Sequence, residues 1–314
     1  MERLVHARAV ALGSAIDTST AKSYTSHLQS YLTFCKLHTF PVTPTADTLS
    51  FYTVYMCHHI RPTSVDSYLS GICNQLEPLY PEVRALRKHA LVTRTLAGCK
   101  KMFNSPPNRK AALETHHLVT LLARFPPSSH DNRLFRALLL SGFFALHRLG
   151  ELVWPDDVDL QSWRKVIMRS SVSLRDDAYG YTLPGHKADR LFTGSQVWVD
   201  DLFAPESLSP AHVFRDYLHS RDALFPLQPA LWLTTAGSIP TRRWFISRLR
   251  SVIPQADISG HSLRAGGATY FAGLGWPDDR IQALGRWSSE AFRIYIREHP
   301  VVLQALLHYR GSRV

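Results

Sequence analysis

The sequence has little cysteine, and its cysteines form no pattern that fixes a fold. Four cysteines occur among 314 residues, and no two of them make a C-x-x-C pair. The run Cys57-His58-His59 has metal-binding residue types, but no second cluster of ligands completes such a site. These absences argue against a zinc ribbon and against a disulfide framework. They favour a buried or partly buried helix segment around Cys57.

Long hydrophobic runs are missing as well. No apolar segment reaches the length of roughly 18 residues that a membrane-spanning helix needs. The apolar stretch at the N-terminus is interrupted by His6 and Arg8, which argues against a signal peptide. With 45% hydrophobic and 19% charged residues, the chain can bury a core. The sequence therefore predicts a folded, soluble intracellular protein without a membrane-spanning segment.

What the sequence has in excess is positive charge. Lys and Arg number 36 and Asp and Glu number 25, which gives a net charge of +11 with neutral histidine. Residues 1–112 hold 13 of these basic and 6 of the acidic residues, a net charge of +7. Such a balance in a globular chain favours a polyanionic partner, such as nucleic acid, an anionic membrane or an acidic protein. Charge alone also fits a basic protein with no such partner.

Hydrophobic periodicity predicts an all-helical domain over residues 1–112. Apolar residues recur at steps of three and four, as on one face of a helix. The four predicted helices are Thr18–Cys35, Leu49–Ile60, Val65–Leu76 and Pro81–Met102. The stretch 104–111 contains two prolines among polar residues and is the predicted linker.

Residues 113–314 form the second predicted domain, in which helices are mixed with a small antiparallel sheet. Short segments rich in β-forming residues predict strands over Arg164–Met168, Tyr179–Leu183 and Gln196–Val199. The predicted helices are Leu118–Ala123, Asn132–Leu146, Ala211–Leu224, Arg242–Val252, His261–Gly273, Asp278–Leu284, Ser289–Glu298 and Val301–Tyr309. The fold class is therefore mainly α with a small antiparallel β-sheet.

The last helix predicted in the first domain carries a basic stripe. Arg84, Arg87, Lys88 and Arg94 fall within an arc of about 120° if the helix is continuous. Such a stripe is usually only a solvated face. The net charge of residues 1–112 favours instead a surface that follows the phosphates of a nucleic acid.

Several residue types in the second domain are suited, together, to one reaction. These residues are Arg148 in HRLGEL, Lys187 in GHKADR, His261 and Arg264 in GHSLRAGG, Trp287 in LGRWSS and Tyr295 in RIYIRE. Taken singly, each has an ordinary interpretation: a surface cation, a lysine in a polar turn, a histidine that caps a helix, or a core aromatic residue.

The combination is suited to transesterification of a phosphodiester. A phosphoryl transition state needs cations on its non-bridging oxygens, a nucleophile in line and a proton for the leaving oxygen. Arginine binds phosphate bidentately and stays protonated. A tyrosine phenol can form a covalent phosphoester, but its free pKa near 10 means that it needs help to lose its proton.

The order R-x-x-E-L, a lysine, H-x-x-R, G-R-W and Y-I-R resembles the tyrosine recombinases, the phage-integrase-like enzymes that break and rejoin DNA. The resemblance covers essentially the whole chain. The segment GRWSSEAFRIYIR is most similar to recombinases of eukaryotic Crypton and DIRS-type mobile elements. The segments T-x-K-S-Y and TSVDSYLSGI also resemble the core-binding helices of those proteins.

The resemblance implies a helical core-binding domain over residues 1–112 and a catalytic domain over residues 113–314. In the catalytic domain, Arg148 and Arg264 would clamp the scissile phosphate. Glu151, three residues after Arg148, would support the architecture of the site through hydrogen bonds. Trp287 would donate a hydrogen bond to a phosphate oxygen from its indole N–H and would pack against the site.

The resemblance also implies the order of chemical steps. Tyr295 would attack the phosphate and leave a 3′-phosphotyrosyl link and a free 5′-hydroxyl. Lys187 would protonate the departing oxygen, and His261 would assist proton transfer around the nucleophile. A 5′-hydroxyl from a second strand would reverse the attack, so neither ATP nor a metal cofactor is expected.

The partners implied are double-stranded DNA and further copies of the chain, as a tetramer on two DNA sites, and no membrane partner is expected. The apolar segment 301–309 fits equally a groove of a neighbouring copy and the core of its own chain. Relation to mobile elements of eukaryotes implies a role in DNA integration and transposition, and a nuclear location.

The sequence departs from the family pattern at one catalytic position. Many members have histidine where Trp287 stands, and Trp287 precedes Tyr295 by eight residues rather than nine. Two other functions remain open at this point. One is a catalytically silent, domesticated DNA-binding module, and the other is a topoisomerase-like enzyme that relaxes DNA without strand exchange.

Overall fold

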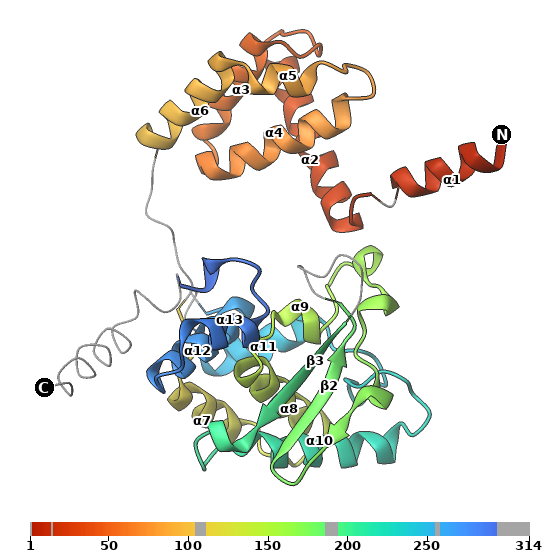
Figure 1. Cartoon of the computed structure of the whole chain (residues 1–314), viewed down its shortest axis with the longest axis vertical. Coiled ribbons are helices and arrows are strands. Elements are labelled where there is room, and N and C mark those ends of the chain that lie inside the picture. The colour runs from red at the N-terminus through yellow and green to blue at the C-terminus, as the bar shows by residue number, and fades with distance from the viewer. Residues whose placement is uncertain (1, 14, 104–110, 186–193, 255–257, 294–314) are drawn as a thin grey trace, which may run out of the picture. The chain divides into compact units, whose positions relative to one another are not determined.

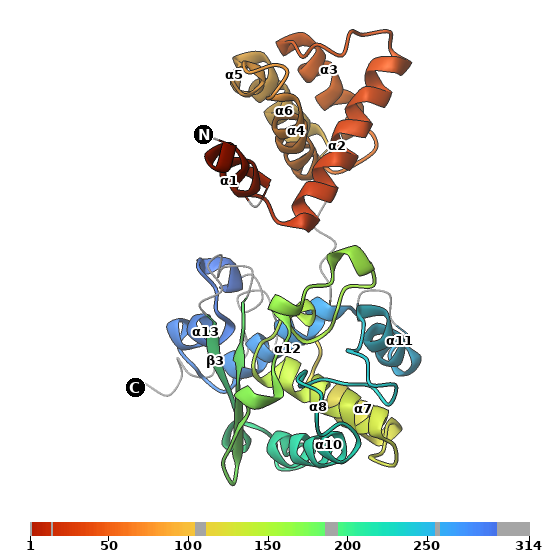
Figure 2. The same cartoon turned by 90° about the vertical axis from the view of Figure 1, so that its right-hand side faces the viewer.

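The computed structural model describes residues 2–13, 15–103, 111–185, 194–254 and 258–293. The chain divides into two compact units, which we call the N-terminal unit (Met1–Asn108) and the C-terminal unit (Arg109–Val314). Each has its own hydrophobic core, and Figures 1 and 2 show the helices and strands of each unit. The assignment of DNA binding to residues 1–112 and of catalysis to residues 113–314 stays a prediction.

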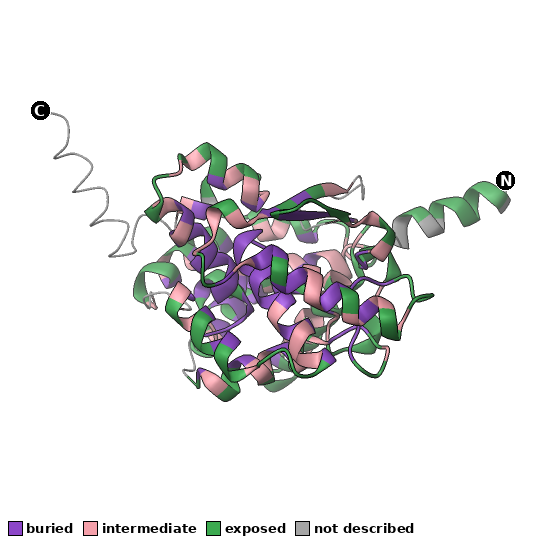
Figure 3. Cartoon of the chain, turned by 90° about the horizontal axis from the view of Figure 1, so that it is seen from below, coloured by how far each residue is buried: buried purple, intermediate pink, exposed green. Residues whose placement is uncertain are grey.

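The described part of the N-terminal unit is helical throughout. Its helices are α1 (Glu2–Gly13), α2 (Thr18–Leu37), α3 (Ala46–Cys57), α4 (Pro62–Leu76), α5 (Val83–Lys88) and α6 (Ala90–Met102). Helices α2, α3 and α4 confirm three of the predicted helices, whereas α1 was not predicted. Helix α1 exposes Leu4 and Val5, and Figure 3 shows its described residues in the colour of exposed positions.

Local signals in the sequence explain where these helices begin. The Asp17 carboxylate accepts a hydrogen bond from the main-chain N–H of Ser19 at the start of α2. Thr45 and Thr48 form a reciprocal capping box at the start of α3. Pro62 occupies the first turn of α4, where its missing N–H costs nothing.

The core of the N-terminal unit contains all four cysteines of the chain. Cys35, Cys57, Cys73 and Cys99 are buried and carry free thiols. Burial is the main reason why the pKa of the Cys57 thiol is raised, to about 12. The expected burial of the segment around Cys57 is therefore confirmed, and these thiols act as small core residues.

The predicted helix Pro81–Met102 is wrong, because the chain breaks at His89. His89 adopts an extended conformation (φ −55°, ψ 143°) that ends α5 and begins α6. Its imidazole Nδ1 accepts a hydrogen bond from the N–H of Leu91, so the histidine serves as the N-cap of α6. An arc calculated for one continuous helix therefore does not describe the four basic residues.

The C-terminal unit is built around α8 (His130–Phe144), which is buried along most of its length. Helices α10 (Pro210–Leu224) and α12 (Gly260–Gly273) pack against it, and Figure 3 shows buried residues gathered at the centre of this unit. The other helices are α7 (Thr115–Arg124), α9 (Leu149–Leu152), α11 (Arg242–Val252) and α13 (Asp278–Gly285). All the helices predicted in this unit up to Leu284 are confirmed.

The sheet of the C-terminal unit has three antiparallel strands in the order β1-β2-β3. Strand β1 is Ser173–Leu174, β2 is Ala178–Leu183 and β3 is Ser195–Asp200. In the register of the last two strands, Tyr181 pairs with Val197. Strands β2 and β3 confirm two of the predicted strands, and the overall fold class is as predicted.

The predicted strand Arg164–Met168 is wrong. Trp163–Lys165 forms a 3₁₀ turn, in which the N–H of Val166 bonds to the carbonyl of Trp163. Val166 and Ile167 are buried, so their β-branched side chains fill the core instead of pairing in the sheet. Met168 makes one isolated bridge to Ala230, and β1 lies further along the chain.

The predicted helix Ser289–Glu298 is described only as far as Arg293, and Glu290–Phe292 forms a 3₁₀ turn there. The predicted helix Val301–Tyr309 lies outside the described residues. None of the helices in the described part of the chain is both long enough and apolar enough to cross a membrane.

Candidate active site

Arg148 and Glu151 meet because their spacing suits the first turn of a helix. Arg148 is the N-cap of α9, and its main-chain N–H donates to Glu151 Oε2 at 3.1 Å. The Arg148 guanidinium donates from Nη1 to Glu151 Oε1 at 3.0 Å. A glutamate three residues after the N-cap reaches back in this way in a capping box. The R-x-x-E motif therefore fixes the direction of the Arg148 side chain.

The same carboxylate holds two further side chains. His147 Nδ1 lies 3.0 Å and Arg286 Nη2 lies 3.1 Å from Glu151 Oε2. On its other side, His147 Nε2 lies 2.8 Å from the hydroxyl of Tyr181 on β2. We call these five residues the Glu151 network. It connects the start of α9 with the sheet and with the end of α13.

Burial and charge decide the protonation states in this network. Burial alone would raise the pKa of Glu151, but hydrogen bonds from His147 and Arg148 and the charge of Arg286 outweigh it. Together they hold that pKa well below its usual range. Burial lowers the pKa of His147 to about 4, although the hydrogen bond that His147 donates to Glu151 acts in the opposite direction. At neutral pH Glu151 is therefore ionised and His147 is uncharged.

These protonation states assign the imidazole tautomer. An ionised carboxylate only accepts hydrogen bonds. His147 Nδ1 therefore carries the proton and donates a hydrogen bond to Glu151. His147 Nε2 then accepts from Tyr181, whose hydroxyl keeps its proton because burial raises its pKa. The Glu151 network thus has one negative charge, on Glu151, and two positive charges, on Arg148 and Arg286.

Arg286 reaches this network through an unusual backbone. It has a left-handed conformation (φ 56°, ψ 43°) at the C-terminal end of α13. Its Nη1 donates to the carbonyls of Ala145, at 3.2 Å, and Leu284, at 3.0 Å. The side chain is only 10% exposed. A non-glycine residue in this conformation is uncommon and points to a constraint on the position.

Arg264 lies on α12 and is almost completely buried, with 3% of the residue exposed. Its guanidinium donates to the carbonyls of Leu146 and Gly285. Leu146 precedes Arg148 by two residues, so Arg264 is fixed to the segment that carries Arg148. The two arginines predicted to act together thus come from separate helices to one region of the C-terminal unit.

Glycines in the segment RAGGAT allow α12 to approach its neighbours. A Cβ atom on Gly266 would lie 2.0 Å from the carbonyl oxygen of Leu113, and one on Gly267 would lie 2.1 Å from that of Phe143. Real Cβ atoms do not approach main-chain oxygens so closely. Gly267 therefore permits the close packing of α12 on α8, and Gly266 permits its close packing on the chain at Leu113.

Trp287 covers Arg264. The guanidinium carbon of Arg264 lies 3.9 Å from the centroid of the indole ring, a cation–π contact. The ring also fills the space next to Gly285, where a Cβ atom would lie 1.6 Å from the indole. Phe292 also packs against Trp287, at 5.7 Å between ring centroids. Trp287 therefore links the end of α13 to the segment that precedes Tyr295.

The remaining predicted site residues are less closely defined. His261 is exposed in the first turn of α12, and its N–H donates to Ser259, the N-cap. Lys187 belongs to the connection between β2 and β3, and Tyr295 follows the 3₁₀ turn at Glu290–Phe292. Both Lys187 and Tyr295 lie outside the described residues.

Three members of the Glu151 network were missed in the sequence: His147, Arg286 and Tyr181. His147 lies four residues before Glu151, the spacing at which side chains meet on a helical turn. Arg286 is the arginine of the G-R-W motif but had no role assigned to it. No local signal in the sequence points to Tyr181, because its contact with His147 arises from the packing of β2.

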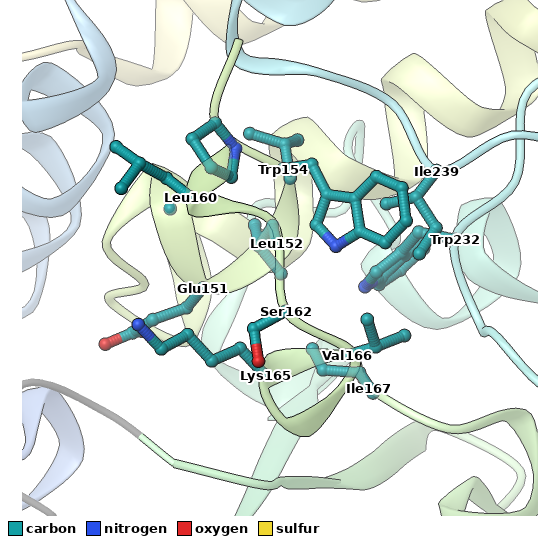
Figure 4. Close-up of a pocket in the computed structure, with 13 residues that line it drawn as sticks. Glu151, Leu152, Trp154, Leu160, Ser162, Lys165, Val166, Ile167, Trp232 and Ile239 are labelled. Atoms are coloured by element: carbon teal, nitrogen blue, oxygen red, sulfur yellow. The ribbon is translucent and has the colours of Figure 1, made fainter. Parts of the chain in front are cut away.

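A small pocket lies beside α9, and Glu151 is one of the residues that line it (Figure 4). It is lined by Leu152, Trp154, Ser162, Val166 and Trp232, among others, and its volume is about 30 Å³, room for only a few water molecules. The indole N–H groups of Trp154 and Trp232 are buried without a hydrogen-bond partner in the described structure. The pocket is too small for a nucleotide, so it is not the substrate site.

Comparison with known proteins gives matches only among solved structures. No protein-family profile and no curated protein matches the sequence. The chain is similar to the Tn1549 transposon integrase in complex with transposon right end DNA, with a TM-score of 0.58 and 11% identity, over 98% of this chain and 99% of that one.

Two further structures agree with this likeness. The XerH site-specific recombinase, bound to palindromic difH substrate, has a TM-score of 0.57 and 14% identity, over 87% of this chain and 74% of that one. A lambda integrase dimer bound to a COC′ core site has a TM-score of 0.56 and 13% identity, with 93% of both chains covered. At these identities the likeness shows the fold, which is the fold of the tyrosine recombinases.

Proposed function

We propose that the protein is a site-specific DNA recombinase or integrase that cleaves and rejoins DNA through a covalent link to Tyr295. The observation that carries this proposal is that Arg264 is bonded to the segment of the chain that carries Arg148. The Arg264 guanidinium bonds to the carbonyl of Leu146, two residues before Arg148. The likeness in fold to DNA-bound recombinases and integrases supports the same conclusion.

The two arginines bind the scissile phosphate. Arg148 is fixed through Nη1 to Glu151, yet its side chain is 26% exposed, so the rest of its guanidinium can bind an oxygen atom from the solvent side. Arg264 lies beneath Trp287 and supplies a second positive charge. Preorganised cations of this kind stabilise charge that develops on phosphate oxygens in the transition state.

The bond changes conserve the energy of the phosphodiester. The Tyr295 oxygen attacks phosphorus, the bond to the 5′ oxygen breaks, and Lys187 supplies the proton to that oxygen. His261, exposed at the start of α12, assists proton transfer around the nucleophile, and the indole N–H of Trp287 donates to a phosphate oxygen. Attack by a 5′-hydroxyl of a second strand releases the tyrosine, so the cycle needs no metal and no ATP.

The N-terminal unit holds the duplex mainly by its phosphates. Its candidate contacts are Arg84, Arg87, Lys88 and Arg94, but they are not equivalent. Arg84 pairs with Glu77 at 2.6 Å and Arg87 pairs with Asp66 at 2.9 Å, whereas Lys88 and Arg94 are exposed. Lys88 and Arg94 are therefore the stronger candidates for sequence-independent phosphate contacts.

The biological setting we propose is a mobile element of the Crypton or DIRS type. The protein would act on the ends of its element in DNA integration and transposition, as a tetramer on two DNA sites, inside the nucleus. Structures of a transposon integrase with transposon end DNA, and of a lambda integrase tetramer on a Holliday junction, support this setting by analogy.

The proposal is tested with nicked suicide substrates. Their sequences are taken from the genomic DNA on either side of the gene that encodes the protein. Cleavage of such a duplex releases a short fragment and traps the covalent intermediate, which a denaturing gel detects. Wild-type protein should form the adduct, and Tyr295→Phe should abolish it. Tyr270→Phe is the matched control, because the Tyr270 hydroxyl donates to the carbonyl of Phe203 in the interior.

Other outcomes overturn the proposal. An adduct that survives Tyr295→Phe excludes that nucleophile. Salt-sensitive DNA binding without an adduct on any substrate identifies a catalytically silent DNA-binding module. Relaxation of supercoiled DNA without preference for a sequence identifies a topoisomerase-like enzyme.

A further inference from the structure

The Glu151 carboxylate presents an electrostatic problem for the proposed reaction. It lies 3.0 Å from the guanidinium of Arg148, and its side chain is only 6% exposed. A buried negative charge next to a phosphate-binding arginine cancels much of that cation's attraction for the phosphate. The substrate needs the opposite, since its phosphodiester is an anion and gains further charge on the way to the transition state.

Arg286 lies where it can solve this problem. Its Nη2 donates to Glu151 Oε2, the oxygen that does not bind the Arg148 guanidinium. Arg264, which bonds to the nearby carbonyl of Leu146, adds a third guanidinium group to this region. These four side chains, three arginines and one glutamate, carry a net charge of +2. Without Arg286 the same group carries +1.

The exposure of the two arginines separates their roles. The Arg148 side chain is 26% exposed, and among the described residues its Nε and Nη2 have no hydrogen-bond partner. The Arg286 side chain is 10% exposed, and both of its terminal nitrogens are occupied by protein oxygens. Its Nε is buried without a partner, which costs stability. Arg148 is thus available to a phosphate, and Arg286 is directed at the protein.

We infer that Arg286 is a positioning residue that neutralises Glu151, so that the charge of Arg148 remains available for the scissile phosphate. Glu151 can then fix the direction of Arg148 without cancelling its charge. This inference rests on the proposed function, because it concerns the phosphate-binding site of the same reaction. It also explains why an arginine with a left-handed backbone conformation occupies the end of α13.

A purely structural role for Arg286 makes a different prediction. Two substitutions that each remove buried hydrogen bonds should combine to damage more than either one alone. If charge balance is what matters, the double variant Glu151→Gln with Arg286→Gln should recover activity, because it removes one negative and one positive charge together. The net charge of the remaining arginines is then again +2.

The test measures single-turnover formation of the covalent adduct on the nicked substrate at saturating DNA. Arg286→Gln should slow cleavage by at least about 100-fold, the effect of losing one preorganised charge interaction. The double variant should cleave at least about 10-fold faster than Arg286→Gln, and Arg286→Lys should lose less activity than Arg286→Gln.

A double variant that cleaves as slowly as Arg286→Gln, or more slowly, overturns the inference. Should Arg286→Gln fail to fold, Arg286→Lys and the double variant are each compared with wild type, and loss of more than 100-fold in both overturns it.

Arg169 and Asp222 provide the matched control pair. Arg169 Nη2 lies 2.7 Å from Asp222 Oδ2 in the same unit, outside the Glu151 network. Arg169→Gln should leave the cleavage rate within a few fold of wild type. An equal loss in Arg169→Gln would attribute the effect of Arg286→Gln to general destabilisation and would overturn the inference.

A second measurement needs neither DNA nor cleavage. NMR titration follows the His147 imidazole, assigned by its absence in His147→Gln. The groups that face it are Glu151, Arg286, Tyr181 and Arg264. Loss of the Arg286 charge should raise the pKa of His147, and an unchanged value contradicts charge balance. A wild-type protein that forms no adduct overturns the proposed function, and the titration then still decides whether Arg286 balances Glu151.

Discussion

The two units of the chain use their cations in different ways. In the N-terminal unit, basic side chains such as Arg84 lie at the surface, and the ion pair with Glu77 is 49% and 41% exposed. In the C-terminal unit, Arg264 and Arg286 are buried and bonded to main-chain carbonyls and to Glu151. Exposed ion pairs contribute little to stability, whereas removing one partner of a buried network is costly.

This difference indicates a division of work. Surface cations of the N-terminal unit can hold a polyanion at many positions, and each can be lost at small cost. Buried cations of the C-terminal unit are fixed to within one geometry, which is the requirement for chemistry at a single phosphate. Substitutions and changes of pH should therefore affect the two units differently. The expected effects are given from the largest to the smallest.

Replacement of Arg264 should have the largest effect. Arg264→Ala removes one of the two arginines proposed to bind the phosphate, and cleavage should fall by about 1,000-fold or more. Single-turnover cleavage of the nicked duplex measures the loss. Arg221 is the matched control, since it is equally buried and also bonds to main-chain carbonyls. If the cleavage rate of Arg264→Ala is within tenfold of that of Arg221→Ala, Arg264 does not bind the scissile phosphate.

Replacement of Glu151 should destabilise the C-terminal unit. Glu151→Ala leaves Arg286 buried without its counter-charge, which should lower the free energy of unfolding by about 3–5 kcal/mol. All seven tryptophans of the chain lie in the C-terminal unit, so urea unfolding followed by tryptophan fluorescence reports on that unit alone. Glu77→Ala in the N-terminal unit should leave this transition unchanged. If the two variants unfold at the same urea concentration, the buried Glu151 network contributes nothing to the stability of the C-terminal unit.

Stability of the C-terminal unit should fall as the pH is lowered from 7 to 5. Burial lowers the pKa of His147 to about 4 in the folded protein, against about 6.5 when unfolded. Between these values only the unfolded chain takes up the proton, so acid favours unfolding. The expected loss is about 2 kcal/mol between pH 7 and pH 5. The depressed pKa of Glu151 adds a further loss only below the unfolded carboxyl value near pH 4.

The variant His147→Gln isolates this effect. Glutamine does not titrate, so the dependence of the urea midpoint on pH should become flatter between pH 7 and pH 5. A slope identical to that of wild-type protein would assign the acid sensitivity to other residues.

Replacement of exposed cations in the N-terminal unit should have the smallest effect. Lys88→Ala and Arg94→Ala should each weaken DNA binding by a few fold and lower the salt slope by about one. Arg84→Ala should change the slope less, because Arg84 is already paired with Glu77. Fluorescence anisotropy of labelled duplex DNA at several salt concentrations measures these slopes. A larger change for Arg84→Ala than for Arg94→Ala would reverse the distinction.

Much of the fold was predictable because the signals are local. The apolar spacing predicted helices from Leu49 and from Val65. The structure starts them three residues earlier, α3 after a threonine capping box and α4 at a proline. The break at His89 was not predictable from such rules, because histidine is not a typical helix breaker and acts here as an N-cap. The segment Arg164–Met168 misled for a related reason, since β-branched residues are equally suited to a buried turn.

The site was predictable only where motifs carry it. Arg148 and Glu151 are linked by the three-residue spacing of a capping box, and His147 adds a contact at a helical spacing. Arg286 depends on tertiary structure, because its side chain crosses from the end of α13 to the start of α9. Tyr181 depends on the register of β2. Long-range contacts of this kind leave no periodic trace in the sequence.

The most direct test of the account is to identify the residue that becomes linked to DNA. The trapped adduct of wild-type protein is digested with nuclease and protease, and mass spectrometry locates the remaining nucleotide. The account predicts a 3′-phosphotyrosyl nucleotide on the peptide that contains Tyr295. A nucleotide on another residue, or a protein that carries none after complete reaction with its substrate, would contradict it.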